Sequence, residues 1–180
     1  MNNINLLYIH NRSLDSSEAN LIQVIQMCSA FTNNNCKVEL LLPKHSSRIF
    51  DLISFINLRF GIVLNFKITF FEKTFNNDKI EKYFGTKKVY DLINNSNAEY
   101  VFLRDPRFIS YVLSCNKKLI FEAHHKLFHN KYFLIDYYWK RKLINYQKNN
   151  NFKLFISISD NLKSYWISKG IFRKKIISIH

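Results

Sequence analysis

The fold of this chain is decided by residues 100–125, which read YVFLRDPRFISYVLSCNKKLIFEAHH. The runs at 100–103 and 119–121 are apolar without alternation, as in strands that are covered on both faces. We expect strands over 100–104 and 119–123, with a helix between them that Pro106 opens. Two buried strands joined by a helix predict a βαβ unit, and therefore a parallel sheet.

Polar side chains follow the ends of these two predicted strands. Arg104 and Asp105 follow the first strand, while Glu122, His124 and His125 surround the end of the second. In open parallel sheets, ligands bind just beyond the carboxyl ends of the strands. We therefore expect a ligand site at the rim, by which we mean the edge of the sheet where the strands have their carboxyl ends.

The rest of the chain continues the alternation of strands and helices. Further strands are expected over 4–9, 37–42, 66–71, 152–158 and 175–179, and helices over 46–57, 78–94, 134–147 and 160–169. Another helix, after the loop 13–18, places Leu21, Val24, Ile25, Cys28 and Phe31 on one stripe. The chain of 180 residues thus predicts a single α/β, Rossmann-like domain over 1–180. We expect a mostly parallel sheet of about six or seven strands with helices on both faces.

The loop before the first helix lacks the G-x-G-x-x-G pattern of dinucleotide-binding domains. The whole chain contains only 3 glycines, which argues against a glycine-rich nucleotide loop. The unpaired N–H groups at the start of this helix can still bind a phosphate or a sugar hydroxyl.

The formal net charge of the chain is +14. Such a charge usually indicates an anionic partner: nucleic acid, an acidic membrane surface or a phosphorylated substrate. The densest basic region is 126–153, where tyrosine and tryptophan are interleaved with Lys126, Lys131, Lys140, Arg141, Lys142, Lys148 and Lys153. Such a surface fits acidic lipid headgroups or other phosphates. The alternative is a solvated helix face, since a lysine-rich composition alone produces one.

The 3 cysteines form no C-x-x-C pair and are odd in number, as expected of reduced thiols in a cytosolic protein. The sequence contains no apolar run of about 18 residues and no signal peptide. We expect a cytoplasmic protein, and peripheral contact with the inner face of the membrane is an open alternative.

Three stretches resemble the amino-terminal half of family 4 glycosyltransferases, which have the GT-B fold. The first is SEANLIQVIQMCSAF at 17–31, followed by the strand at 38–43. The second is Val101-x-x-Arg104-Asp105, followed after a helix by Phe121-Glu122-Ala123-His124. The third is ISISDNL at 156–162, with Gly170 and the strand before His180 behind it. The order of these stretches extends the resemblance over essentially the whole chain.

The resemblance implies the acceptor-binding half of a GT-B enzyme. Complete relatives transfer a hexosyl group, with retention of configuration, from a nucleotide-sugar to a glycan or lipid-linked acceptor. They usually work without a metal, and a second domain binds the nucleotide-sugar donor. We expect no cofactor for this chain. That domain and its acidic motif are missing from these 180 residues. We therefore expect the isolated chain to have little or no activity.

The resemblance also assigns roles to residues. His124 takes the catalytic position, near the reacting sugar. Ser16 and Ser17 stand where many relatives have two glycines, in the loop that approaches the donor phosphates or the acceptor. The substrate-binding candidates are Ser16, Ser17, Glu18, Asn20, Arg104 and Glu122. Two alternatives stay open for Arg104: it either binds an acceptor phosphate or pairs with Glu122 or Asp105. Glu122 is expected to hold either His124 or Arg104 in position.

Two other functions are compatible with the sequence. The first is a non-catalytic basic module that docks on an anionic membrane or on nucleic acid. Peripheral membrane contact would use Lys126, Lys131, Lys140, Arg141 and Lys142, and we expect no nucleic acid as a partner. The second is a metal hydrolase that uses His124, His125 and His129, but few acids or thiols accompany these histidines.

Overall fold

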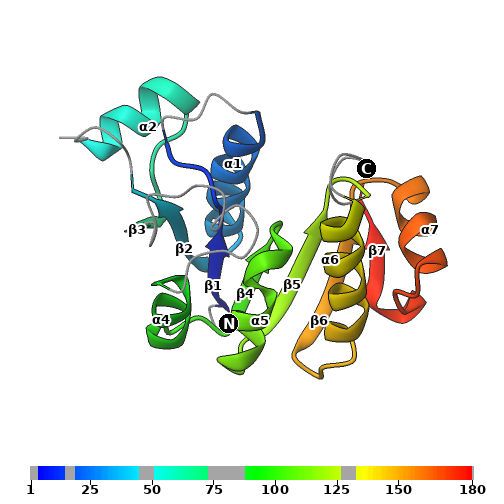
Figure 1. Ribbon diagram of the computed structural model, residues 1–180. Helices are drawn as coiled ribbons and strands as arrows, with labels where there is room; N and C mark the ends of the chain where they lie inside the picture. Colours follow the sequence, from blue (N-terminus) through cyan, green and yellow to red (C-terminus); the bar gives the residue numbers. More distant parts are fainter. Residues whose placement is uncertain (1–3, 15–18, 45–50, 73–87, 127–132, 180) are drawn as a thin grey trace.

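The computed structural model describes residues 4–14, 19–44, 51–72, 88–126 and 133–179. These residues form a seven-stranded sheet with the strand order β3-β2-β1-β4-β5-β6-β7 (Figure 1). Every pair of neighbouring strands is parallel. The prediction of a Rossmann-like parallel sheet is therefore confirmed.

The strands are β1 (Ile4–Ile9), β2 (Cys36–Pro43), β3 (Lys67–Phe71), β4 (Tyr100–Leu103), β5 (Lys118–Ala123), β6 (Phe152–Ser157) and β7 (Ile176–Ser178). The α-helices of the described part are α1 (Ala19–Asn33), α2 (Leu52–Phe60), α4 (Lys88–Asn95), α5 (Ile109–Ser114), α6 (Phe133–Tyr146) and α7 (Asp160–Ser168). A short 3-10 helix, η1 (Pro106–Phe108), leads into α5, so Pro106 opens the helical segment as predicted.

The chain changes direction across the sheet between β1 and β4. It runs outward from β1 through β2 to β3, then returns to β4 and continues to β7 at the opposite edge. β1 and β4 are hydrogen-bonded neighbours, with Ile9 paired to Leu103. This reversal creates a topological switch point, where open parallel sheets bind their ligands.

Alternate strand residues face opposite sides of the sheet and build two cores. On one side, Leu7, Val101, Phe121 and Phe155 pack in a cluster that includes residues of α4, α5, α6 and α7. On the other side, Tyr8, Leu40 and Phe102 pack with α1 and α2. The predicted stripe of α1 is confirmed for Leu21, Val24, Ile25 and Cys28, which are fully buried. Cys28, Cys36 and Cys115 form no disulfide.

The helix predicted over 46–57 differs from α2. Residues 45–50 lie outside the described part, and α2 begins after Asp51, whose carboxylate accepts a hydrogen bond from the Ser54 amide at 3.1 Å. The predicted end at Asn57 is wrong, because the helix continues to Phe60 and stops at Gly61 in a left-handed conformation. Ile56 and Phe60 form the buried face of α2, and Ile53 is 60% exposed.

The other predicted helices are present in the structure wherever their residues belong to the described part of the chain. Of the segment 78–94, only the part from Lys88 is described, as α4. α6 corresponds to the helix expected over 134–147, and it buries Trp139 and Leu143. No helix among the described residues is both long and apolar enough to cross a membrane.

Candidate functional site

Strand register brings the predicted site residues together at the rim. Leu103 at the end of β4 pairs with Phe121 of β5, and β5 continues for two residues along β6. Glu122 therefore lies beside the point where β4 ends and Arg104 follows. The sequence places Arg104 and Glu122 18 residues apart, but parallel pairing makes them neighbours.

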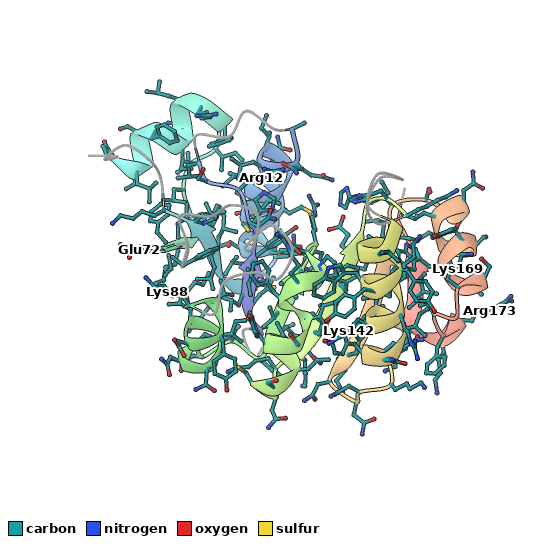
Figure 2. All side chains as sticks on the ribbon, viewed as in Figure 1. Arg12, Glu72, Lys88, Lys142, Lys169 and Arg173 are labelled. Carbon is teal, nitrogen blue, oxygen red and sulfur yellow. The ribbon has the colours of Figure 1, made fainter. Side chains whose placement is uncertain are left out.

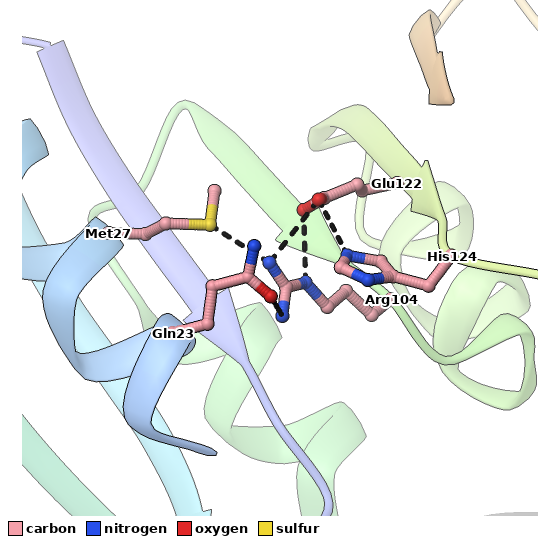
Figure 3. Close-up of polar contacts among 5 residues, drawn as sticks. All are labelled: Gln23, Met27, Arg104, Glu122 and His124. Carbon is pink, nitrogen blue, oxygen red and sulfur yellow. Dashed lines mark hydrogen bonds and ion pairs between the residues drawn. The ribbon is translucent and has the colours of Figure 1, made fainter. Parts of the chain in front are cut away.

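Arg104 and Glu122 form a buried, two-pronged ion pair (Figure 3). Arg104 Nε donates to Glu122 Oε2 at 3.0 Å, and Nη2 donates to Oε1 at 3.3 Å. The Arg104 side chain is 10% exposed and that of Glu122 is fully buried. Of the alternatives open for Arg104, the geometry shows the pairing with Glu122. A direct contact between Arg104 and a substrate stays a prediction.

The same guanidinium group also ties helix α1 to the rim. Nη1 donates to Gln23 Oε1 at 3.2 Å, and Nη2 lies 2.9 Å from Met27 Sδ. Gln23 and Met27 are four residues apart, so they lie on the same side of α1. Arg104 thus holds three elements together: α1, the end of β4 and the end of β5.

His124 completes the chain of contacts (Figure 3). Its Nε2 lies 2.6 Å from Glu122 Oε1, and its side chain is 24% exposed. Burial raises the pKa of Glu122, but the hydrogen bond from His124 and the charge of Arg104 outweigh burial, so this pKa lies below its ordinary value. Glu122 is therefore an anion at neutral pH and can only accept hydrogen bonds. It follows that Nε2 of His124 carries the hydrogen, and Nδ1 is the remaining ring nitrogen.

This arrangement determines what His124 can do chemically. In the neutral ring, Nδ1 has a free lone pair and accepts a hydrogen bond from a hydroxyl group. A carboxylate that fixes the tautomer and orientation of an imidazole is a common supporting arrangement in functional sites. The site thus offers a fixed, partly exposed imidazole above a buried ion pair.

A second polar cluster joins the loop after β1 to the end of β4. Asp105 accepts a hydrogen bond from Asn11 Nδ2 at 2.7 Å and from the Arg107 amide at 3.0 Å. The Arg107 guanidinium also pairs with the Asp105 carboxylate, and Arg107 is 9% exposed. This cluster fixes the backbone at the switch point and starts η1.

His10 lies at the end of β1 and is 5% exposed. Its Nε2 has no hydrogen-bond partner among the described residues. Burial and the positive charges of Arg104 and Arg12, opposed by the negative charge of Asp105, together lower the pKa of His10 to about 4. His10 is therefore neutral at pH 7 and forms part of the same electrostatic environment as Arg104.

The remaining predicted residues are only partly described. Ser16, Ser17 and Glu18 lie outside the described residues. Asn20 is exposed in the first turn of α1, three residues before Gln23, which places it on the side of the helix that faces Arg104. Of the three histidines considered for a metal, His124 and His125 are described and His129 is not. The described residues contain no group of three or more His, Cys, Asp or Glu that could hold a metal ion.

Sequence reasoning did not assign site roles to Gln23, Met27 and His10. Gln23 and Met27 belong to the first stretch that resembles the glycosyltransferases, so the motif itself was the available signal. His10 directly follows a strand, and the rule that identified His124 applies to it as well.

No family model and no curated protein matches this chain. Solved structures resemble it in fold. Anabaena Alr3699/HepE in complex with UDP and glucose matches with a TM-score of 0.62 and 12% identity, over 98% of this chain and 44% of that one. A putative UDP-N-acetylglucosamine 2-epimerase from Listeria monocytogenes matches with a TM-score of 0.61 and 12% identity, over 98% and 45% of the two chains. The lipopolysaccharide outer core galactosyltransferase WaaB matches with a TM-score of 0.53 and 9% identity, over 97% and 44%.

At these identities the likeness shows the fold alone. This chain spans about half the length of the solved proteins that it matches. It has the Rossmann-like architecture of one half of a GT-B protein.

Proposed function

We propose that this chain is the acceptor-binding half of a retaining glycosyltransferase of the family 4 type. The reaction would move a hexosyl group from a nucleotide-sugar to a glycan or lipid-linked acceptor. The observation that carries the proposal is the convergence of Arg104, Glu122 and His124 at the rim of a GT-B-like half. The donor would be bound only when a second domain faces this rim.

In this proposal His124 positions a sugar hydroxyl. Glu122 holds Nε2, so Nδ1 accepts the hydroxyl hydrogen and fixes the direction of the oxygen lone pairs. Arg104 balances the charge of Glu122, which keeps the carboxylate ionised although it is buried. The site needs neither a metal nor a cofactor for this role.

Fold likeness does not separate glycosyl transfer from epimerisation, because a putative epimerase and a galactosyltransferase both match this chain. The order of sequence motifs favours transfer. The Arg104-Asp105 and Glu122-x-His124 stretches resemble the glycosyltransferases, and the structure brings Arg104, Glu122 and His124 into contact.

Titration calorimetry tests whether the isolated chain binds a nucleotide-sugar without a second domain. We expect UDP-glucose and GDP-mannose to bind the isolated chain with a dissociation constant above about 1 mM, which corresponds to roughly 4 kcal/mol of binding free energy or less. Micromolar binding of either nucleotide-sugar without a partner would refute the half-site assignment.

Ligand-observed NMR with methyl glycosides tests the acceptor side. We expect weak binding that His124→Ala removes. His125→Ala is the matched control, because His125 is the adjacent residue and is exposed. A signal that survives His124→Ala would mean that the glycosides bind elsewhere, and an equal loss in both variants would mean that the effect is not specific to His124.

A further inference from the structure

Positive charge is concentrated at one end of the molecule. Residues 123–180 contain 12 of the 27 Lys and Arg residues but only 2 of the 13 Asp and Glu residues. Figure 2 shows Lys142 at α6, and Lys169 and Arg173 beside α7, while Glu72 and Lys88 lie toward the opposite end of the sheet. Glu72 there forms ion pairs with both Lys44 and Lys88. The two ends of the protein therefore differ strongly in electrostatic potential.

The outer side of α6 is apolar and aromatic at its start and basic further on. Leu134 is 78% exposed, and Tyr137 and Tyr138 are 56% and 41% exposed. Arg141 on the same side and Lys148, two residues after the end of α6, are exposed, whereas Trp139 and Leu143 on the inner side of α6 are buried. A leucine and two tyrosines next to basic residues are typical of helices that lie at a membrane interface.

Lysine ammonium groups gather around tyrosine rings on α6 and α7. Lys126, Lys140 and Lys169 each lie 5.1–5.6 Å from the centre of the Tyr165 ring, although they come from three different segments. Lys142 lies 5.1 Å from the ring centre of Tyr138. These cation–π contacts hold the ammonium groups in place and concentrate positive charge over a small area. An array of this kind fits a partner that presents many anions side by side.

We propose that this face docks on an anionic lipid membrane. The α6–α7 basic surface consists of Lys126, Lys140, Arg141, Lys142, Lys148 and Lys169. Its lysines and arginine meet the phosphates of the headgroups, and Leu134 and Tyr137 enter the boundary between headgroups and acyl chains. Lipid is favoured over nucleic acid because an exposed leucine gains free energy in a bilayer and has no apolar partner on a nucleic acid backbone.

The topology sets the orientation of the docked molecule. α6 follows β5, so its first turn lies near the rim end of that strand. A membrane that receives Leu134 and Tyr137 therefore also lies close to the edge that carries His124. This last step rests on the proposed function, since it would bring a lipid-linked acceptor to the site, whereas docking itself does not depend on it.

Vesicle sedimentation tests the docking. The probe is a vesicle of equal parts phosphatidylglycerol and phosphatidylcholine, compared with pure phosphatidylcholine. We expect the triple variant R141A/K142A/K148A to lose about a hundredfold in partition coefficient, because each basic residue at an anionic surface contributes roughly fivefold. The matched control K44A/K67A/K88A removes the same charge from exposed lysines at the other end and should change binding by less than about threefold.

A second pair of measurements separates a membrane from nucleic acid. L134S/Y137S should weaken vesicle binding about tenfold, because it removes the apolar contribution while the net charge stays the same. Equal losses in the two triple variants would overturn the proposal, as would stronger binding of a single-stranded RNA oligonucleotide than of the vesicles. Thermal unfolding of each variant establishes that it is folded, so a loss of binding cannot arise from unfolding.

Discussion

At the scale of single residues, Glu122 is central to the rim. It is fully buried and anionic, and it contacts both Arg104 and His124. An anion in a low-dielectric interior is tolerated only while its partners remain. The same residue therefore links the stability of the domain to the orientation of the proposed site.

Replacing Arg104 by methionine should be strongly destabilising. The substitution leaves Glu122 buried without its cation, so we expect the free energy of unfolding to fall by about 3 kcal/mol or more. Urea denaturation measures this change. The double variant R104M/E122Q should recover part of the loss, because the uncompensated charge is gone, and a double variant less stable than the single one would contradict this explanation.

His10 should make the protein sensitive to mild acid. Its pKa is about 4 in the folded state, below the ordinary value of 6.5, so the unfolded chain binds the proton first as the pH falls. The stabilising contribution is complete above about pH 6.5 and decreases by up to about 3 kcal/mol toward pH 4.

The difference in stability between wild type and His10→Gln isolates this effect. Between pH 6.5 and 4.5 the wild type should lose stability faster than the variant. Glu122 does not interfere in this range, because its lowered pKa moves its own loss of stability below about pH 4.5. Parallel pH profiles would show that His10 does not titrate as described.

Sequence analysis could identify Arg104, Glu122 and His124, because each lies at or just beyond a strand end. It could not identify the contacts of Arg104 with Gln23 and Met27. These residues are 81 and 77 positions away along the chain, and their contact depends on how α1 packs over the sheet. The sequence alone also could not decide which partner Arg104 pairs with, because that depends on the register between β4 and β5.

At the scale of elements, helix ends show where local chemistry determines structure. Ser159 caps α7, since its hydroxyl accepts a hydrogen bond from the Leu162 amide at 3.2 Å. The strand Ile4–Ile9 also has the predicted bounds. α2 was misplaced because apolar spacing alone did not show that the left-handed residue Gly61, rather than Asn57, ends the helix.

Replacing Ser159 by alanine should lower the free energy of unfolding by about 1 kcal/mol, through loss of the cap of α7. Thermal denaturation measures the effect. Ser168→Ala is the control in the same helix, since Ser168 is exposed and its hydroxyl donates to the Tyr165 carbonyl at 2.8 Å without capping the helix. A Ser159 variant as stable as the control would show that the cap contributes nothing.

Gly61→Ala should also cost about 1 kcal/mol. Gly61 has φ +66°, and a Cβ atom there would meet nothing within 4 Å, so the cost arises from the backbone alone. Asn35, just after α1, has φ 64°, and Asn35→Gly should therefore be neutral or slightly stabilising. Chemical denaturation measures the free energy of unfolding of both variants. A Gly61→Ala protein as stable as the wild type would rule out the backbone argument.

At the scale of the whole molecule, the fold was predictable because each βαβ unit has only one favourable hand. Residues 100–125 required a parallel pair, and the other units extended it to a seven-stranded sheet. The proposed division of function between the rim and the α6–α7 basic surface was harder to predict from the sequence. It depends on which helices cover which face, and α6 exposes Tyr137 while burying Trp139 two residues later.

The central claim is that His124 receives a sugar hydroxyl at a half-site fixed by Glu122. The most direct measurement is nitrogen-15 NMR of the His124 ring during titration with a methyl glycoside, with UDP-glucose as the comparison. We expect a ring protonated on Nε2 at rest, and an Nδ1 resonance that moves with the glycoside but not with UDP-glucose. A resting ring protonated on Nδ1, or ring resonances unchanged while the glycoside binds, would contradict the account.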